Sequence, residues 1–179
     1  MKPIFLIGFM GSGKTTLGRA LEETTSMRFI DLDDYIEERI GMSISEYFTH
    51  AGEDGFRRAE RDALREIADG EDVVIACGGG TPCFFDNMEV MNSRGTTVWL
   101  DASRERLFER LIVAIDHRPL LKAKSPDQIR EFIDSSLKER HPYYSQAHFM
   151  LPSDLLENPR EIASTVTQFL QLVGLHHLM

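Results

Sequence analysis

A glycine-rich loop close to the start of the chain limits the folds that are open to it. The segment IFLIGFMGSGKTT, residues 4–16, places Gly8, Gly13, Lys14 and Thr15 in the pattern G-x-x-x-x-G-K-[ST]. This pattern follows a buried strand, opens a helix, and wraps backbone N–H groups around nucleotide phosphates. The lysine carries charge toward the β and γ phosphates, and the threonine hydroxyl ligates Mg²⁺. The sequence therefore predicts ATP or GTP binding with Mg²⁺, through Gly11, Ser12, Gly13, Lys14, Thr15 and Thr16.

Short apolar, β-branched runs alternate along the chain with longer segments of helical period. The runs are IFLIG, RFIDLD, VVIAC, TVWLD and HFML. Such alternation favours a parallel sheet with helices on both faces. We therefore predict a three-layer α/β/α fold with a five-stranded parallel sheet, in one domain of residues 1–179. Residues 43–68 have a helical pattern and predict a projecting helical lobe, and the polar stretch 116–128 predicts a mobile surface loop.

Charge and composition restrict the partners of the chain. Its formal net charge of −9 argues against nucleic acid, which needs a basic face. No apolar run approaches the roughly 18 to 20 residues of a membrane span, and the apolar start ends in a glycine loop rather than a cleavage site. We therefore expect a cytoplasmic protein. Cys77 and Cys83 are too few for a disulfide framework and predict two buried free thiols.

The absence of two sequence strings disfavours a GTPase. Neither the guanine-selecting N-K-x-D nor the switch D-x-x-G occurs. A kinase needs an acceptor site, and Asp31 and Asp33 alternate at the end of a predicted strand, which would place them on the same side of it. One carboxylate near Mg²⁺ and one near an acceptor hydroxyl is what phosphoryl transfer to an alcohol requires. Asp34 is interpreted as the cap of the following helix.

Two further segments bear on the acceptor. In GEDGFRRAERDAL, Arg57 and Arg58 point about 100° apart on a helix, so only one of them can face a given pocket. The same run also fits a solvated face with i,i+3 and i,i+4 ion pairs. In VVIACGGG, residues Gly78–Gly80 follow a buried strand. They fit a flexible turn, or a backbone that lies against a ligand at the carboxyl edge of the sheet.

Taken together, GFMGSGKTT, FIDLDDYIE, GEDGFRRAE, CGGG, DHRPLL and KERHPYY resemble the shikimate kinase family, in this order over nearly the whole chain. The resemblance implies the fold of the nucleoside monophosphate kinases, with a substrate-binding lobe at about 32–61 and a lid at about 112–125. It implies Mg²⁺-dependent transfer of phosphate from ATP to the 3-hydroxyl of shikimate, in chorismate and aromatic amino-acid biosynthesis. We expect a monomer, because such a fold needs large movements of lobe and lid.

The resemblance also implies roles for individual residues. Asp33 matches the aspartate that contacts the shikimate hydroxyls and acts as base, and Asp31 matches one associated with Mg²⁺ through water. In the lid, Arg118 matches an arginine that closes over ATP and acts in catalysis with Lys14, and Arg110 is expected to flank the adenine. The remaining shikimate-binding positions are Arg57 and Arg140, which match the pair that holds the carboxylate, and Gly78, Gly79 and Gly80.

Two alternatives stay open on the sequence. One is another small-molecule kinase of similar fold, such as a gluconate kinase or a nucleoside monophosphate kinase. The other is a regulatory or structural nucleotide-binding protein that has lost turnover. The second predicts a replaced catalytic position, yet residues compatible with catalysis stand at Lys14, Thr15, Asp33, Arg57 and Arg118.

Overall fold

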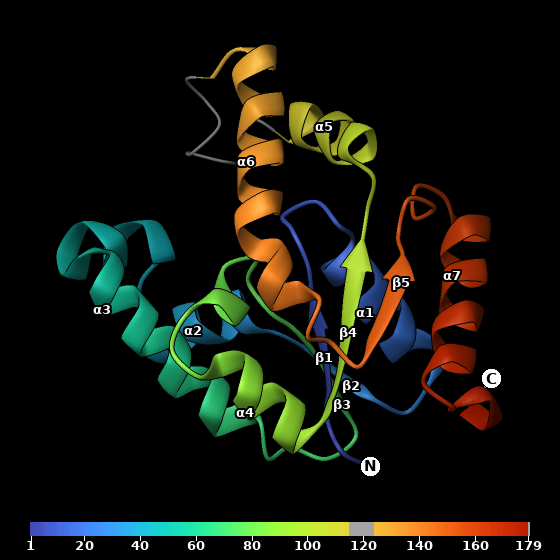
Figure 1. The fold of residues 1–179 in the computed structure, drawn as a ribbon. Helices are drawn as coiled ribbons and strands as arrows, with labels where there is room; N and C mark the ends of the chain where they lie inside the picture. Colours follow the sequence, from blue (N-terminus) through green and yellow to red (C-terminus); the bar gives the residue numbers. More distant parts are fainter. Residues whose placement is uncertain (115–123, 179) are drawn as a thin grey trace.

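The computed structural model of the chain describes residues 1–114 and 124–178 (Figure 1). Its centre is a five-stranded sheet in the order β2-β3-β1-β4-β5, and every strand pair is parallel. The strands are β1 (Ile4–Ile7), β2 (Arg28–Asp31), β3 (Val73–Ala76), β4 (Thr96–Asp101) and β5 (Phe149–Pro152). The five predicted strands are therefore confirmed, and their carboxyl ends meet at one edge of the sheet.

Helices cover both faces of the sheet, which confirms the predicted three layers. The α-helices are α1 (Lys14–Thr24), α2 (Leu32–Ile40), α3 (Ile44–Ile67), α4 (Asn87–Arg94), α5 (Arg104–Val113), α6 (Pro126–Tyr144) and α7 (Pro159–Leu172), and the short 3₁₀ turns are η1 (Thr81–Cys83) and η3 (His176–Leu178). Helices α1 and α7 pack together on one face. Helices α2, α3 and α4 and the end of α6 pack on the other (Figure 1).

The alternation of side chains along a strand explains why the sheet is buried on both sides. In β1, Ile4 and Leu6 belong to the core under α1 and α7, whereas Phe5 and Ile7 belong to the core under α3 and α4. All four side chains are buried. A central strand of a doubly covered parallel sheet must be apolar at every position, as β1 is.

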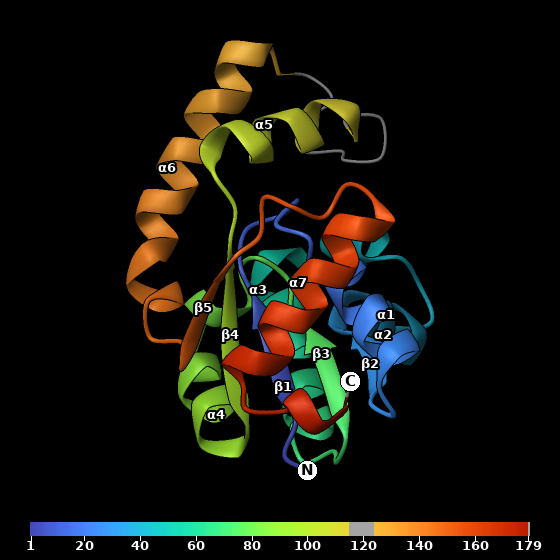
Figure 2. The ribbon, with the colours of Figure 1, turned by 90° about the vertical axis from the view of Figure 1, so that its right-hand side faces the viewer.

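Beyond the carboxyl ends of the strands, α5 and the first part of α6 pack on each other around a third, smaller core (Figure 2). Most of the polar stretch that predicts a loop over 116–128 lies outside the described residues, and its residues 126–128 form the first turn of α6 instead of a loop. A capping box between Ser125 and Gln128, with Pro126 at the first helical position, starts this helix. Within the described ranges, no helix is long and apolar enough to cross a membrane.

Candidate active site

The loop between β1 and α1 adopts a conformation that requires glycine. Gly8, Gly11 and Gly13 have φ angles of 141°, 81° and 95°, which side chains rarely tolerate. A Cβ atom at Gly8 would also lie 2.6 Å from the Leu100 carbonyl oxygen, and one at Gly13 would collide with Leu156. The loop therefore packs closely against its neighbours, and its backbone leads into the start of α1.

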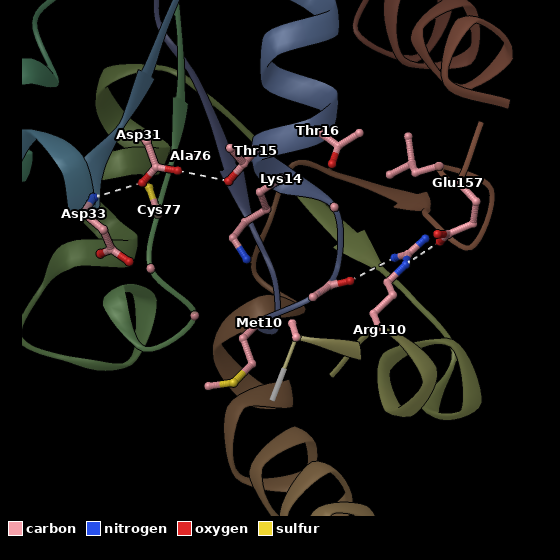
Figure 3. A pocket seen from close by; sticks show the side chains of 16 residues that line it. Met10, Lys14, Thr15, Thr16, Asp31, Asp33, Ala76, Cys77, Arg110 and Glu157 are labelled. Atoms are coloured by element: carbon pink, nitrogen blue, oxygen red, sulfur yellow. Dashed lines mark hydrogen bonds and ion pairs between the residues drawn. The ribbon is translucent and has the colours of Figure 1, made fainter. Parts of the chain in front are cut away.

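A cavity of about 390 Å³ lies at this loop (Figure 3). It is bordered by the predicted phosphate-binding residues, by both predicted aspartates, and by part of the glycine triplet. Its lining residues are Met10, Gly11, Gly13, Lys14, Thr15, Thr16, Asp31, Asp33, Ala76, Cys77, Gly78, Gly79, Arg110, Ala114, Leu156 and Glu157. Ser12 is buried inside the loop instead of lining the cavity.

Polar groups at the start of α1 face this cavity. The Lys14 ammonium donates hydrogen bonds to the carbonyl oxygens of Gly8 (2.8 Å) and Phe9 (2.9 Å). The Thr15 hydroxyl donates to Asp31 Oδ2 at 3.0 Å (Figure 3). A hydroxyl and a carboxylate side by side are hard oxygen donors of the kind that Mg²⁺ prefers, with phosphates and water as its other ligands.

Asp31 and Asp33 both reach the cavity, but not because they alternate along one strand. Strand β2 ends at Asp31, whose Oδ1 accepts a hydrogen bond from the Asp33 backbone N–H at 3.1 Å and so caps α2. Asp33 lies in the first turn of that helix. The interpretation of Asp34 as the cap is also wrong, because α2 begins at Leu32, two residues before Asp34, and its cap is Asp31.

The environment of Asp33 favours its protonated form. Burial raises the pKa of this carboxyl, and the nearby carboxylates of Asp31 and Glu60 raise it further. The Lys14 ammonium acts in the opposite direction, and the resulting pKa is about 6. A carboxyl with this pKa is mostly ionised at neutral pH and still a better proton acceptor than an ordinary aspartate.

The glycine triplet Gly78–Gly80 brings together the residues predicted for the acceptor. A Cβ atom on its first glycine would lie 3.1 Å from Asp33 Oδ1. One on its second glycine would lie 3.0 Å from Arg140 Nη1, and one on its third 2.8 Å from Arg57 Nη2. Each glycine thus leaves room for one of three side chains that come from α2, α6 and α3, and the flexible-turn interpretation does not account for this arrangement.

The guanidinium of Arg57 is held from several sides. Its Nη1 donates to Glu60 at 2.9 Å, and its Cζ lies 4.0 Å from the centroid of the Phe84 ring. Glu60 is only 1% exposed and also accepts a 2.5 Å hydrogen bond from the Thr81 hydroxyl. Arg57 Nε is buried and has no hydrogen-bond partner among the described residues. By contrast Arg58 is exposed, so Arg57 is the member of the pair that faces inward.

Arg140 approaches the triplet from the last turns of α6. Its guanidinium carbon lies 5.4 Å from the centroid of the Phe9 ring. In residues 1–114 and 124–178 it forms no ion pair with a carboxylate, although eleven ion pairs occur there. Its charge is therefore available to an anion at the glycine triplet.

Arg110 borders the cavity, but its hydrogen bonds go to the protein. It donates to the carbonyl oxygens of Gly11 (2.9 Å), Ser153 (3.0 Å) and Asp154 (3.1 Å), and to the Glu157 carboxylate (2.7 Å). It thereby ties α5 to the phosphate loop and to the segment after β5 (Figure 3). Only a face of its planar guanidinium could contact an adenine.

Several residues at the site were not predicted from the sequence. Glu60 belongs to the charged run GEDGFRRAERDAL, for which a solvated face was one interpretation. Its i,i+3 spacing from Arg57 is the signal that could have identified it. Leu156 and Glu157 border the cavity without any local motif. Arg118 lies outside the described residues. Of the two thiols predicted to be buried, Cys77 is buried, but Cys83 is half-buried, so that part of the prediction is wrong.

Comparisons with known proteins agree on one family. The chain matches the family model described as shikimate kinase over residues 10–171. A shikimate kinase from Phocaeicola vulgatus is 52% identical over 166 residues, which cover 93% of this chain and 95% of that protein. A crystal structure of shikimate kinase from Bacteroides thetaiotaomicron is similar with a TM-score of 0.94 and 47% identity, over 97% of this chain and 98% of that one. A shikimate kinase from Acinetobacter baumannii, in complex with shikimate, has a TM-score of 0.85 and 33% identity over 100% and 96% of the two chains.

Proposed function

The chain belongs to the shikimate kinase family, and on that premise we propose that it transfers the γ-phosphoryl group of ATP to the 3-hydroxyl of shikimate. This reaction serves chorismate and aromatic amino-acid biosynthesis. The observation that carries the proposal for this chain is the glycine triplet, which borders Asp33, Arg57 and Arg140 beside the phosphate loop. A small hydroxylated carboxylic acid needs cationic groups for its acid and a carboxylate for its hydroxyls.

Arg57 and Arg140 are proposed to hold the shikimate carboxylate. The buried Nε of Arg57 is a donor without a protein partner among the described residues, and an unsatisfied buried donor is costly unless a ligand meets it. Arg140 offers a guanidinium without a carboxylate partner in that part of the chain. Gly78, Gly79 and Gly80 complete the acceptor site, because a Cβ atom at any of them would crowd these side chains and the space for a ligand.

Asp33 is proposed to accept the proton of the attacking hydroxyl. Its pKa of about 6 leaves it ionised at neutral pH, ready to orient the hydroxyl and to take the proton as the bond to phosphorus forms. The oxygen of shikimate attacks the γ-phosphorus, the bond to the β–γ bridging oxygen breaks, and ADP leaves with the electron pair. Asp33 is adjacent to the triplet and in the same cavity as the phosphate loop, as this transfer requires.

The phosphates of ATP are proposed to bind the loop backbone from Gly11 to Thr16 and the positive end of α1. Lys14 stabilises the negative charge on the transferring group. Arg118, from the lid at about 112–125, is proposed to approach the same group. Arg110, from α5, is proposed to flank the adenine. A lid that closes over ATP excludes water, which would otherwise accept the phosphoryl group.

Thr15 and Asp31 are proposed to hold Mg²⁺, Asp31 through a water molecule. Their adjacent oxygens fit a cation that takes few ligands from the protein and the rest from phosphates and water. When bound there, Mg²⁺ would neutralise negative charge that develops on the phosphates. The proposal further includes a substrate-binding lobe at about 32–61, a monomeric state and a cytoplasmic location.

An acceptor screen tests the function directly. ADP release would be measured with Mg²⁺ and ATP, with shikimate, gluconate or AMP offered alone as acceptor. We expect turnover with shikimate only, in the range of about 1–100 s⁻¹ that is typical of kinases. Release with another acceptor, and none with shikimate, would leave the fold and the phosphate loop intact and would overturn the acceptor roles of Asp33, Arg57 and Arg140.

A second measurement tests the base. Replacing Asp33 with Asn keeps the size of the side chain but removes its ability to accept a proton. We expect kcat to fall about 10²-fold or more, because general-base catalysis contributes on that scale, while the Kd for ATP stays near that of the parent. An unchanged kcat would remove Asp33 from this role.

A further inference from the structure

Tyr144, the last residue of α6, contacts the glycine triplet from inside the core. Its side chain is fully buried, and its hydroxyl donates a hydrogen bond of 2.5 Å to the carbonyl oxygen of Gly79. Burial raises the pKa of this hydroxyl to about 12, although the charge of the neighbouring Arg140 guanidinium lowers it. The hydroxyl is therefore protonated at any physiological pH and can donate to the Gly79 carbonyl.

Gly79 is the point at which the acceptor side of the site contacts the nucleotide side. A Cβ atom there would lie 3.0 Å from Arg140 Nη1, and 3.4 Å from both the Gly8 carbonyl oxygen and the Met10 backbone nitrogen. Arg140 and the phosphate loop thus both lie close to the space beside the Gly79 Cα atom. A small shift of this peptide would change the space available to the Arg140 guanidinium.

The ring of Tyr144 is fixed by its own neighbours. Its centroid lies 5.9 Å from that of Trp99, a β4 residue, and Trp99 in turn meets the edge of His141 at 5.7 Å. Tyr144 also belongs to the core that α3 and α4 form on the sheet. Because aromatic packing holds the ring, the position of its hydroxyl is determined by the core on the sheet and not by the residues of the acceptor site.

We propose that Tyr144 is a positioning residue for the acceptor site, which fixes the Gly79 carbonyl and the Arg140 guanidinium relative to each other. The inference rests on the proposed function, in which Gly79 and Arg140 bind shikimate. The side chain of Tyr144 is fully buried and so is not exposed to either substrate. It acts by holding the peptide of Gly79 still and by limiting the orientations of Arg140, so that less ordering is needed when the carboxylate binds.

The variant Tyr144→Phe isolates the hydroxyl, because phenylalanine fills almost the same volume and keeps the aromatic packing. It leaves the Gly79 carbonyl without its donor and removes the hydroxyl dipole next to Arg140. Losing such a buried hydrogen bond corresponds to a change of about tenfold in an equilibrium constant. We expect the Kd and KM for shikimate to rise about tenfold, with the Kd for ATP within about twofold of the parent.

The adjacent Tyr143→Phe is the matched control, because it makes the same chemical change in a side chain that is 37% exposed. Calorimetric titrations with shikimate and with ATP, together with steady-state kinetics and thermal unfolding, would be run on the parent and both variants. A purely structural role predicts a lower unfolding temperature and equal weakening of both ligands. Either that result or a Tyr144→Phe variant that behaves as Tyr143→Phe would overturn the inference.

A double-mutant cycle keeps the test independent of the stability of one variant. If Tyr144 acts partly through Arg140, the loss of shikimate affinity in Tyr144→Phe combined with Arg140→Lys should be smaller than the sum of the separate losses. Strictly additive losses would contradict the proposed coupling. A parent enzyme that neither binds nor phosphorylates shikimate would instead refute the proposed function, and this result is obtained before any variant is made.

Discussion

The Asp33 carboxyl is half-buried and lies near the carboxylates of Asp31 and Glu60, which contribute with burial to its pKa of about 6. In the unfolded chain the same group has a pKa near the ordinary value of 3.8. Between these two values the folded protein binds the proton more tightly than the unfolded one. The free energy of unfolding therefore falls as the pH rises through this window, by about 3 kcal/mol in total.

This linkage predicts that Asp33→Asn stabilises the protein while it removes activity. At pH 7.5 the variant should exceed the parent by about 2 to 3 kcal/mol in the free energy of unfolding, and the gain should disappear toward pH 4. Urea denaturation without nucleotide and with a metal chelator would measure it. The matched comparison is Asp34→Asn in the same helical turn: burial and Asp31 also raise the pKa of this carboxyl, but its side chain is exposed, so its gain should be smaller than that of Asp33→Asn. A gain that does not depend on pH would contradict the electrostatic origin.

The neighbouring arginines Arg57 and Arg58 provide a second matched pair. Arg57→Ala removes the buried guanidinium proposed to bind the shikimate carboxylate, and should raise the Kd for shikimate about 10²-fold while it changes the Kd for ATP little. Arg58→Ala removes the same group from an exposed position and should leave both constants unchanged. Titration of each variant with each ligand distinguishes the two. Equal weakening of both ligands by Arg57→Ala would indicate misfolding of α3 rather than loss of a contact.

The sequence alone could not show which of these two arginines faces the site, because helical geometry shows only that their side chains point in different directions. What decides is the core of α3, where Phe56 and Glu60 are buried and Arg57 is directed to the glycine triplet. The glycines of the loop between β1 and α1, in contrast, follow from the local sequence pattern, since Gly8, Gly11 and Gly13 all have a positive φ. Glu60 was missed because a buried carboxylate is recognised by its partners, which come from η1 as well as from α3.

At the scale of elements, α3 depends on one glycine. Gly52 has φ 67° and ψ −177° inside the helix and joins two helical segments across a kink. No atom lies within 4 Å of a Cβ atom built there, so the need for glycine is conformational and not steric. This backbone region is essentially restricted to glycine.

Gly52→Ala should therefore destabilise the protein by about 1 to 3 kcal/mol. Gly41→Ala is the control, because Gly41 also has open space and a positive φ of 71°, but with the ψ of 20° that alanine can adopt in the left-handed helical region. That substitution should cost only about 1 to 2 kcal/mol. Urea denaturation of the two variants compares the costs. A smaller loss at Gly52 than at Gly41 would show that the segments on either side of the kink adjust freely.

Element boundaries were harder to predict than elements. All five strands were found from their apolar runs, but the end of β2 was placed two residues late, because Leu32 continues the apolar alternation while its backbone already belongs to α2. Helix α6 was not predicted from the sequence. Its start is polar and contains a proline, which is typical of a loop as well as of a first helical turn.

For the whole molecule, the order of the strands could not be predicted from the chain alone. The chain passes from β1 to β2 at the edge of the sheet and only then to β3, which lies between them. That order is set by long-range packing, and it determines that Asp31 and the glycine triplet flank the phosphate loop. The roles of Arg140 and Tyr144 depend on the same packing, because α6 reaches the triplet from a distant part of the sequence.

The three cores differ in size, and this predicts where the molecule opens first. Within residues 1–114 and 124–178, the two cores on the sheet contain fifteen and twelve buried hydrophobic residues, whereas the core between α5 and α6 contains six. A small core that stands beyond the sheet should open at a lower free energy than the sheet itself. Besides its packing on α6 and on Phe9, helix α5 is tied to the rest of the protein through Arg110, which bonds to the phosphate loop and to the segment after β5.

Amide hydrogen exchange in the absence of ligands should therefore be faster in α5 and in residues 126–133 of α6 than in β1 and β3. Helix α4 is the internal control, because it is also short but packs on a large core, and it should exchange more slowly than α5. Adding ADP with Mg²⁺ should slow exchange in α5, since the nucleotide would contact the cavity that Arg110 borders, whereas shikimate alone should affect α5 less. If α5 exchanges as slowly as β1 without ligand, the small core is as stable as the sheet, and closure over the nucleotide cannot rely on its independent movement.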